Sequence, residues 1–277
     1  MKKVKILQGS CIDKIKELED NSIDCVVSSP PYFGLRDYGV DEQFGLEKTY
    51  QDYLANTVKV FETFKPKLKD TATIWWNIGD SYSSGKRTST TNQSLRGNKE
   101  YGVTRTPVQN GIKEKDLLMI PNRVAIALQD AGWYVRSEII WHKPNPMPES
   151  VRDRPTSCHE KIWLITKNKK YFYDTEAIKE PCVTNDDTMK NKRNVWTVNT
   201  KPFKGAHFAT FPKDLIEPCI KAGCPEGGVV LDPFGGSGTT GIVSALNNRN
   251  AVLIELNTEY VKIAEKRIEN ELGLFNS

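Results

Sequence analysis

Two short stretches of the sequence carry side chains whose types and spacing could perform chemistry. The first is Ser29-Pro30-Pro31-Tyr32, which follows the apolar run 24–27. Two consecutive prolines remove two backbone N–H donors and fix two φ angles, so the stretch holds its neighbours rigidly. An isolated stretch of this kind is most often a turn that ends a strand, with its tyrosine in the core. It could also hold a hydroxyl, a carbonyl oxygen and an aromatic ring at fixed positions around a small ligand.

The second stretch is a glycine-rich segment, 235–241, between a predicted strand at 228–232 and a predicted helix at 239–247. This order brings a backbone close to a nucleotide-like ligand. Because no lysine follows the last glycine, the segment is not a phosphate-binding P-loop. Residues 236–241 do match the G-x-G-x-x-G pattern of dinucleotide enzymes. Glu255 ends the next predicted strand, where it could accept hydrogen bonds from both hydroxyls of a ribose.

Two features distinguish this loop from that of a nicotinamide or flavin dehydrogenase. The strand ends in Asp232-Pro233-Phe234, which is expected to place a carboxylate and an aromatic ring at the ligand. We also expect too little chain after the loop for the rest of a dinucleotide fold. S-adenosylmethionine has a ribose for Glu255 and an adenine for apolar and aromatic groups, but no pyrophosphate, and it fits better. A nucleotide-cofactor oxidoreductase remains the alternative.

The elements that must position these stretches alternate along the chain. Apolar periodicity predicts strands over 4–8, 24–27, 71–78, 133–141, 161–167, 228–232 and 250–255. It predicts helices over 11–18 and 50–64, from 120, over 239–247 and from about 259. Strands that alternate with helices predict an α/β fold with a doubly wound, mainly parallel sheet. A length of 277 residues suits a single catalytic domain over 1–277.

Composition excludes several classes of protein. Hydrophobic residues make up 38% and charged residues 27% of the chain, as in ordinary globular proteins. The six cysteines and three histidines are scattered without Cys-x-x-Cys pairs, so neither a disulfide framework nor a metal site is expected. A net charge of +4 permits nucleic-acid binding without requiring it. Without a signal peptide or a membrane-length apolar run, a cytoplasmic protein with no membrane partner is expected.

Together the motifs resemble the site-specific DNA amino-methyltransferases, which modify the exocyclic amino nitrogen of adenine or cytosine. The hallmark of that family is (Asp/Asn/Ser)-Pro-Pro-(Tyr/Phe/Trp), here Ser29 to Tyr32, followed in the β-group order by a loop similar to 232–240. The resemblance extends through 141–146, 154–160 and 205–212. It implies a Rossmann-like, S-adenosylmethionine-dependent methyltransferase fold with a circularly permuted motif order. Gly9 is followed by Ser10 instead of the family's aspartate, so no acidic contact with the cofactor adenine is expected there.

The resemblance also implies roles for individual residues. Ser29 and the Pro30 carbonyl would accept hydrogen bonds from the amino group of a flipped base as positive charge develops on its nitrogen. Tyr32 would stack on that base, and with Pro31 these residues form the expected catalytic tetrapeptide. The methyl group would move from S-adenosyl-L-methionine in a direct displacement, without a covalent enzyme intermediate. The expected cofactor-binding residues are Asp232, Pro233, Phe234, Gly235, Gly236, Ser237, Gly238, Thr239, Glu255, His207, Phe208 and Phe211.

The first residue of the tetrapeptide bears on the choice of base. Serine there is similar to the cytosine-modifying members of the family, whereas aspartate is more typical of the adenine enzymes. The resemblance therefore favours N4 of cytosine as the methylated atom, with N6 of adenine as the alternative. Hydrogen bonding alone does not separate the two, because both bases present an amino donor beside a ring-nitrogen acceptor.

Two polar stretches, 81–115 and 182–200, interrupt the alternation of strands and helices. Both could be solvated surface loops, but long loops without secondary structure of their own are often functional. We expect them to contact double-stranded DNA through Lys86, Arg87, Arg96, Lys99, Arg105, Lys190, Lys192 and Arg193. The resemblance also allows a cognate restriction endonuclease as a partner. A DNA-binding module with a vestigial pocket is a further alternative, and the oligomeric state is left open.

Overall fold

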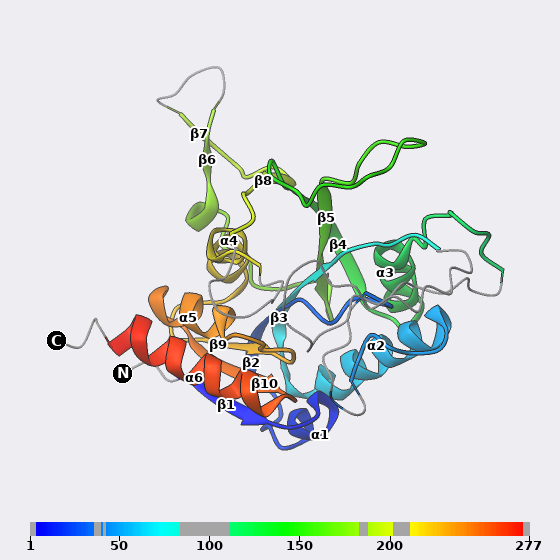
Figure 1. Cartoon of the computed structure of the whole chain (residues 1–277). Helices are drawn as coiled ribbons and strands as arrows, with labels where there is room; N and C mark the ends of the chain where they lie inside the picture. Colours follow the sequence, from blue (N-terminus) through cyan, green and yellow to red (C-terminus); the bar gives the residue numbers. More distant parts are fainter. Residues whose placement is uncertain are drawn as a thin grey trace.

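An eight-stranded sheet forms the centre of the protein (Figure 1). The computed structural model describes residues 4–35, 40, 43–83, 111–182, 188–201 and 211–273. Along the sheet the strand order is β1-β10-β9-β2-β3-β5-β4-β8. The strands are β1 (Val4–Gln8), β2 (Ile23–Ser28), β3 (Leu68–Ile78), β4 (Tyr134–His142), β5 (His159–Thr166), β8 (Val195–Thr197), β9 (Val229–Asp232) and β10 (Asn250–Glu255). A separate antiparallel pair joins β6 (Glu180–Pro181) to β7 (Met189–Lys190).

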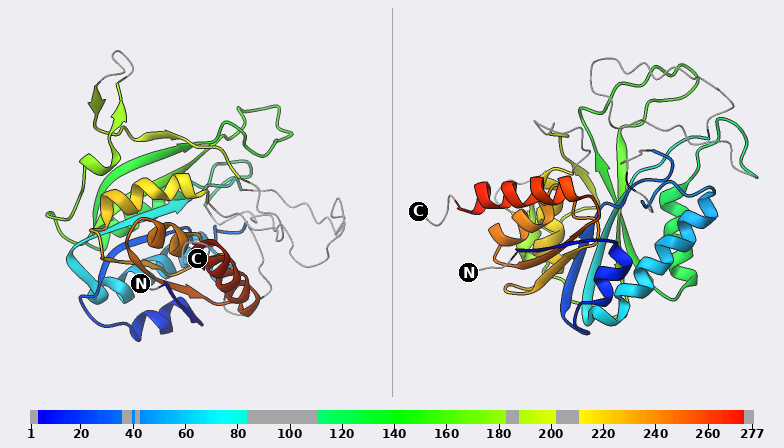
Figure 2. Two further views of the ribbon diagram at one scale, coloured as in Figure 1. Left: turned by 90° about the vertical axis from the view of Figure 1, so that its left-hand side faces the viewer. Right: turned by 60° about the horizontal axis from the view of Figure 1, so that its bottom comes forward.

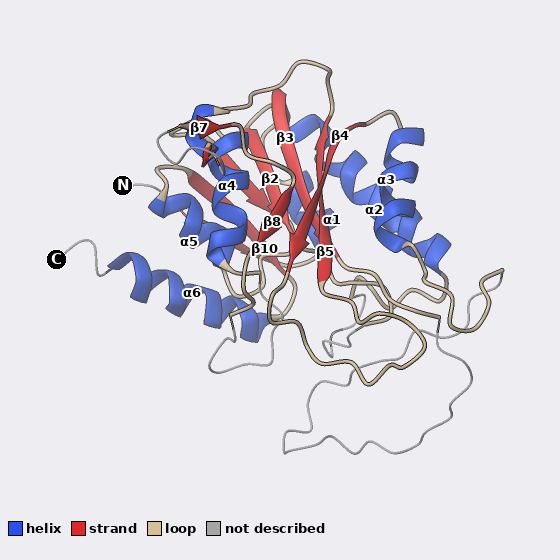
Figure 3. Cartoon of the chain, turned by 90° about the horizontal axis from the view of Figure 1, so that it is seen from above, coloured by secondary structure: helices blue, strands red, loops and turns tan. Residues whose placement is uncertain are grey.

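Helices cover both faces of this sheet (Figures 2 and 3). They are α1 (Cys11–Lys16), α2 (Tyr50–Phe64), α3 (Ile120–Asp130), α4 (Lys213–Gly223), α5 (Thr239–Leu246) and α6 (Thr258–Gly273), with short 3₁₀ turns η1 (Lys65–Lys67) and η2 (Glu176–Ile178). Figure 3 shows α2 and α3 on one side of the strands and α4, α5 and α6 on the other. Among the described residues, none of the helices is both long enough and apolar enough to cross a membrane.

The two faces carry separate hydrophobic cores, because consecutive side chains of a strand point to opposite faces. Trp76 on β3 is fully buried on the face of α2, with its ring centre 5.0 Å from that of Phe61. Trp75 belongs to the core on the opposite face, together with Cys219 and Ile220 of α4. The sheet is therefore buried on both sides, which is typical of parallel sheets.

Strand directions confirm a mainly parallel sheet with one exception. Neighbouring strands from β1 through β10, β9 and β2 to β3 are parallel, and β4 is parallel to β8. Strand β5 is antiparallel to both β3 and β4. The reason lies in the connection 143–158, which joins β4 to β5 and holds no helix. Parallel neighbours need a crossover, whereas antiparallel neighbours can be joined by a loop.

The strand order reverses direction between β2 and β9, which are neighbours in the sheet. The chain runs from β2 outward to β3 on one side and from β9 outward to β10 on the other. In open α/β sheets, ligands bind outside the carboxyl ends of the strands at such a switch point. This topology places the end of β2, which leads into the tetrapeptide, beside the end of β9, which leads into the glycine loop.

Candidate active site

Direct contacts join the two chemistry-bearing stretches at this switch point. Ser28, the last residue of β2, donates a hydrogen bond from Oγ to Oδ1 of Asp232, the last residue of β9, at 2.6 Å. The second carboxylate oxygen of Asp232 accepts from Thr240 Oγ1 on α5 at 2.6 Å, and Phe234 N donates to Oδ1 at 3.1 Å. Burial raises the pKa of Asp232 to about 6. Each hydrogen bond favours the ionised form and opposes this effect of burial.

Asp232 is the residue expected to place a carboxylate at the ligand. It lines the cavity described below, but both of its oxygens are engaged by protein donors from β2, the loop and α5. These contacts fix the end of β2 relative to the glycine loop. Asp232 is thus a residue that positions the site, and the chain separation between its partners explains why this role was not visible in the sequence.

Gly238, which was expected among the cofactor-binding residues, has a packing role in the glycine loop. It precedes α5 with a φ of +82°, in the left-handed region that favours glycine. A Cβ added there would lie 3.1 Å from Cβ of Ala264 on α6, and Gly238 does not line the cavity. The absence of a side chain at Gly238 therefore allows close packing of the loop against α6.

Arg267 on α6 also binds the glycine loop, through hydrogen bonds to Ser237 and Thr239. Its Nη1 donates to the carbonyl oxygen and to Oγ of Ser237, both at 2.6 Å, and lies 3.2 Å from Oγ1 of Thr239. The glycine loop is thus fastened on one side to β2 through Asp232 and on the other to α6 through Arg267. Such contacts pre-organise a loop before its ligand arrives.

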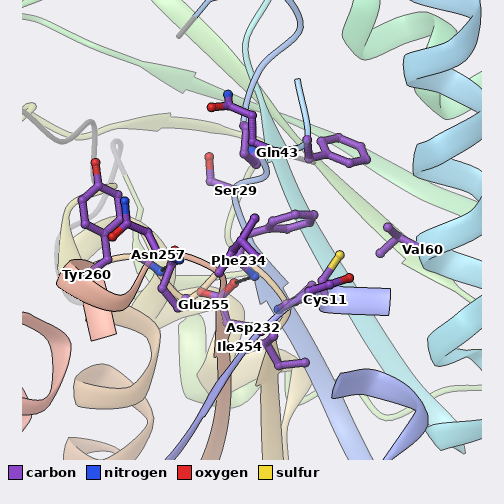
Figure 4. A pocket seen from close by; sticks show the side chains of 18 of the residues that line it. Cys11, Ser29, Gln43, Val60, Asp232, Phe234, Ile254, Glu255, Asn257 and Tyr260 are labelled. Atoms are coloured by element: carbon purple, nitrogen blue, oxygen red, sulfur yellow. Dashed lines mark hydrogen bonds between the residues drawn. The ribbon is translucent and has the colours of Figure 1, made fainter. Parts of the chain in front are cut away.

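Glu255 lies at the end of β10 with its side chain at the cavity (Figure 4). Its Oε2 accepts from the backbone N–H of Gly236 at 2.9 Å, and its Oε1 accepts from that of Asn257 at 2.8 Å. Burial raises the pKa of Glu255 above its ordinary value. A carboxylate has about four lone-pair sites, so each oxygen can accept a further hydrogen bond from a ligand.

A cavity of about 280 Å³ opens between these elements (Figure 4). Most of the predicted site residues line it, namely Ser29, Pro31, Phe211, Asp232, Pro233, Phe234, Gly235, Gly236, Ser237, Thr239 and Glu255. Ser10, which stands where the family carries an aspartate, and its neighbour Cys11 also line it. Pro30 and Tyr32 lie next to the lining residues in the chain, while His207 and Phe208 fall outside the described residues.

Several lining residues were missed by sequence reasoning. Phe44 forms part of an aromatic wall, with its ring centre 5.3 Å from that of Phe234 and 4.9 Å from that of Tyr53. Asn257 and Tyr260 follow β10 and flank Glu255 (Figure 4). Their position just past a strand of a parallel sheet was the signal that could have found them. Phe44 offered no such signal, because it lies between predicted elements.

The tetrapeptide is anchored by a network of hydrogen bonds. Ser29 Oγ donates to Oη of Tyr32 at 3.2 Å, and Tyr32 Oη donates to Oε2 of Glu160 on β5 at 2.6 Å. Glu160 also forms an ion pair with Lys143 and accepts from Nδ2 of Asn77 at 3.2 Å. Burial, and next the negative charge of Glu160, raise the pKa of Tyr32 well above its ordinary value, so the phenol stays neutral.

Two further contacts hold the tetrapeptide in place. Tyr53 on α2 donates from its hydroxyl to the carbonyl oxygen of Pro31 at 3.1 Å. A Cβ added to Gly79, just past β3, would come within 2.6 Å of the Tyr32 ring, so only glycine lets the ring lie there. Sequence reasoning assigned Tyr32 a stacking face alone. The structure adds a hydrogen bond from its hydroxyl to Glu160. The sequence did not predict this bond, because the two residues are 128 positions apart.

The structure does not bring the described basic candidates to the cavity. Nζ of Lys190 lies 3.6 Å and Nζ of Lys192 3.8 Å from the carboxylate of Glu180. Because β8 is parallel to β4 and Val195 pairs with Ile140, residues before Val195, including Arg193, lie toward the amino end of β4. Their role in DNA binding stays a prediction. The other five basic candidates, Lys86, Arg87, Arg96, Lys99 and Arg105, fall outside the described residues.

The switch point of the sheet brings the tetrapeptide and the glycine loop to the same cavity. Glu255 at the end of β10, the aromatic rings of Phe44 and Phe234, and Ser29 of the tetrapeptide all line this one cavity. A family model described as DNA methylase, of the N6/N4 type, matches residues 23–266. The chain belongs to this family of N6/N4 DNA methylases.

Individual proteins agree with this membership. The chain is 49% identical to the Type II methyltransferase M.Cfr9I of Citrobacter freundii over 96% of its own length and 88% of that protein. Its fold is similar to that of PvuII DNA methyltransferase (cytosine-N4-specific), with a TM-score of 0.71 at 18% identity over 99% and 92% of the two chains. It is also similar to the crystal structure of the M1.HpyAVI–SAM complex, with a TM-score of 0.59 at 20% identity over 95% and 99%.

The family assignment decides between the alternatives left by the sequence. The protein is a DNA methyltransferase of the N6/N4 class, and its closely related sequences are named as Type II methyltransferases. The oxidoreductase suggested by the G-x-G-x-x-G pattern is ruled out. The expected Rossmann-like methyltransferase fold is confirmed.

Proposed function

We propose that this protein transfers a methyl group from S-adenosyl-L-methionine to N4 of a flipped cytosine in double-stranded DNA. The methyl donor is S-adenosyl-L-methionine. The observation that supports the choice of cytosine is Ser29 at the first position of the tetrapeptide, where it lines the cavity (Figure 4). Adenine N6 is the alternative that the family also accommodates.

The lining of the cavity suits this cofactor. Glu255 offers two carboxylate oxygens to the ribose hydroxyls, since each keeps a lone pair beyond its contact with the backbone. Phe234 and Phe44 supply aromatic surface to the adenine, and Val60 on α2 adds an aliphatic wall. When bound, the cofactor supplies an electrophilic methyl group. The chain itself has to orient that group toward the tetrapeptide and hold the base beside it.

The tetrapeptide prepares the amino nitrogen to attack. Its lone pair is delocalised into the base, so the amine is a weak nucleophile. Hydrogen bonds from the amino group to Ser29 Oγ and to the Pro30 carbonyl direct negative potential at the nitrogen while positive charge develops on it. The contact from Tyr53 to the Pro31 carbonyl keeps these acceptors fixed, so little reorganisation is needed during the reaction.

DNA contact is proposed to come mainly from the basic residues of 81–115, with a contribution from 182–200. Charge on these stretches would neutralise phosphates, and the asparagines and arginines among them could contact base edges. A cytoplasmic location and a cognate restriction endonuclease are part of the same proposal. Their support is the class of Type II methyltransferases to which the similar M.Cfr9I belongs by name.

The base is identified by analysis of the methylated product. DNA from a host that expresses the protein is digested to nucleosides, which are separated and identified by mass, while sequencing of the modified DNA gives the recognition site. We expect N4-methylcytosine. N6-methyladenine as the sole product would overturn the choice of base, and the same host without the expressed protein provides the background.

A further inference from the structure

Hydrogen bonds with one fixed direction lead from the tetrapeptide to Glu160. Ser29 Oγ donates to Tyr32 Oη, and Tyr32 Oη donates to Glu160 Oε2 at 2.6 Å. Tyr32 Oη also lies 3.2 Å from Oδ1 of Asn77. A phenol has only one proton, and the shorter contact to Glu160 takes it.

The carboxylate at the end of this series decides its direction. An ionised carboxylate can only accept hydrogen bonds, so Tyr32 has to donate to Glu160. The oxygen of Tyr32 is then available as an acceptor for the single proton of Ser29. Since that proton is used, Ser29 Oγ presents only lone pairs to anything bound in the cavity.

The surroundings of Glu160 keep it in this role. Its other oxygen is paired with Nζ of Lys143, and the two side chains are only 17% and 16% exposed. Asn77 on β3 donates from Nδ2 to the same oxygen that Tyr32 contacts. Lys143 is itself held, with Nζ 4.2 Å from the centre of the Trp141 ring. All these partners approach the carboxylate as donors, so Glu160 is the acceptor in each contact, including the one with Tyr32.

We propose that Glu160 acts through Tyr32 as a positioning residue that makes Ser29 a hydrogen-bond acceptor only, so that the pocket admits a base with an amino group and rejects its deaminated form. This inference rests on the proposed function. The amino group of cytosine or adenine donates to Ser29. The carbonyl oxygen of uracil or hypoxanthine would instead meet the lone pairs of Ser29, which leaves both acceptors unpaired and repelling.

Two variants break the series at different points. Glu160→Gln keeps the shape of the side chain, but its amide can donate to Tyr32 and reverse the direction of both hydrogen bonds. Tyr32→Phe keeps the ring and removes the hydroxyl, so the proton of Ser29 is free to point into the cavity. Glu138→Gln is the matched control, because Glu138 on β4 is also paired with a lysine, Lys161, and has no contact with Tyr32.

Two quantities are measured on DNA that carries the recognition site. One is the dissociation constant for duplexes with the target base or its deaminated form opposite an abasic site, so that flipping breaks no base pair in either. The other is the single-turnover rate of methyl transfer at saturating cofactor and DNA. We expect the wild type and Glu138→Gln to bind the amino base about tenfold more tightly than its deaminated form.

Glu160→Gln and Tyr32→Phe are expected to lose the preference for the amino base over its deaminated form. Their rate of methyl transfer should fall at least about tenfold, with unchanged cofactor affinity. The double variant should be no slower than the slower single variant, because both act through one series of bonds. A wild type that methylates DNA, with both variants keeping rate and preference, would overturn this inference alone. A wild type that transfers no methyl group to DNA would overturn the proposed function.

Discussion

At the scale of single residues, Glu255 is the side chain whose alteration should weaken cofactor binding most directly. Its two oxygens face the cavity and already order Gly236 and Asn257. Glu255→Gln replaces one acceptor oxygen with a donor, so one charge-assisted hydrogen bond to the ribose is lost. Such a bond contributes about 1.5–3 kcal/mol, which corresponds to a roughly 10- to 100-fold weaker binding of S-adenosylmethionine by calorimetry.

The control for this variant is Glu259→Gln. Glu259 lies in the first turn of α6, where it is paired with Lys262 in an exposed ion pair. Exposed pairs of this kind contribute little, so neither stability nor cofactor affinity should change noticeably. Equal affinities of wild type and Glu255→Gln, with both proteins folded, would remove Glu255 from the cofactor site.

Residue types could be predicted from the sequence better than residue partners. An acid at a strand end was sufficient to suggest the role of Glu255, whereas the role of Ser29 was implied by the resemblance of the tetrapeptide to the family. The engagement of Asp232 by Ser28 was not predictable, because these residues are 204 positions apart and the contact exists only in the folded sheet. The contact between Tyr32 and Glu160 was not predictable either, because these residues are also far apart in the chain. In addition, a phenol next to prolines is equally compatible with stacking and with hydrogen bonding.

At the scale of elements, the join between β9 and α5 depends on Gly238. Gly238→Ala forces a side chain into the left-handed region and toward Ala264, at 3.1 Å. We expect a loss of about 1–2 kcal/mol in the free energy of unfolding from the backbone alone. The displaced start of α5 should also lower the affinity for S-adenosylmethionine, measured on the folded fraction by calorimetry.

Gly227→Ala separates these two effects. Gly227 has a φ of +76° and nothing within 4 Å of an added Cβ. An alanine there therefore has the same unfavourable backbone conformation as one at position 238, but it contacts no neighbouring side chain. Its free energy of unfolding should fall by a similar amount, with cofactor affinity unchanged. If Gly238→Ala also left the affinity unchanged, packing of the loop against α6 would not matter for the cofactor.

Secondary structure followed the sequence closely wherever periodicity was strong. The helix predicted over 50–64 is α2 (Tyr50–Phe64), and the strand predicted over 250–255 is β10 (Asn250–Glu255). The reversed direction of β5 was not predictable from its own residues. A buried strand is apolar in either direction, so only the connection from β4, without a helix, distinguishes the two.

For the whole molecule, the order of strands in the sheet decides which distant segments meet, and no local sequence pattern reveals that order. The tetrapeptide and the glycine loop are separated by about 200 residues, and they meet because β2 and β9 are neighbours. The alternation of strands and helices predicted a doubly wound sheet, and the resemblance implied the permuted motif order. Which two strands flank the switch point follows from the fold alone.

DNA binding is also a property of the whole surface, and it can be tested by groups of residues. Replacing Lys86, Arg87, Arg96, Lys99 and Arg105 with glutamine should weaken DNA binding and flatten the dependence of log K on log salt concentration, by roughly 0.9 for each lost phosphate contact. Cofactor affinity should not change. Fluorescence anisotropy at several salt concentrations measures the slope.

A second group provides the comparison for this test. Lys190, Lys192 and Arg193 precede β8, and the two lysines lie near Glu180, so we expect their replacement to change the slope less. If neither group altered the slope, the two polar stretches would not form the DNA-binding face. A larger effect from the second group would move that face toward the β6–β7 hairpin.

Ser29→Ala removes the hydroxyl proposed to accept a hydrogen bond from the amino nitrogen as positive charge develops on it. The measurement is the single-turnover rate of methyl transfer to DNA at saturating S-adenosylmethionine and saturating DNA. We predict a roughly 100-fold slower rate, with dissociation constants for cofactor and DNA within about threefold of wild type. A rate equal to that of the wild type would contradict the assignment of the tetrapeptide as the catalytic site.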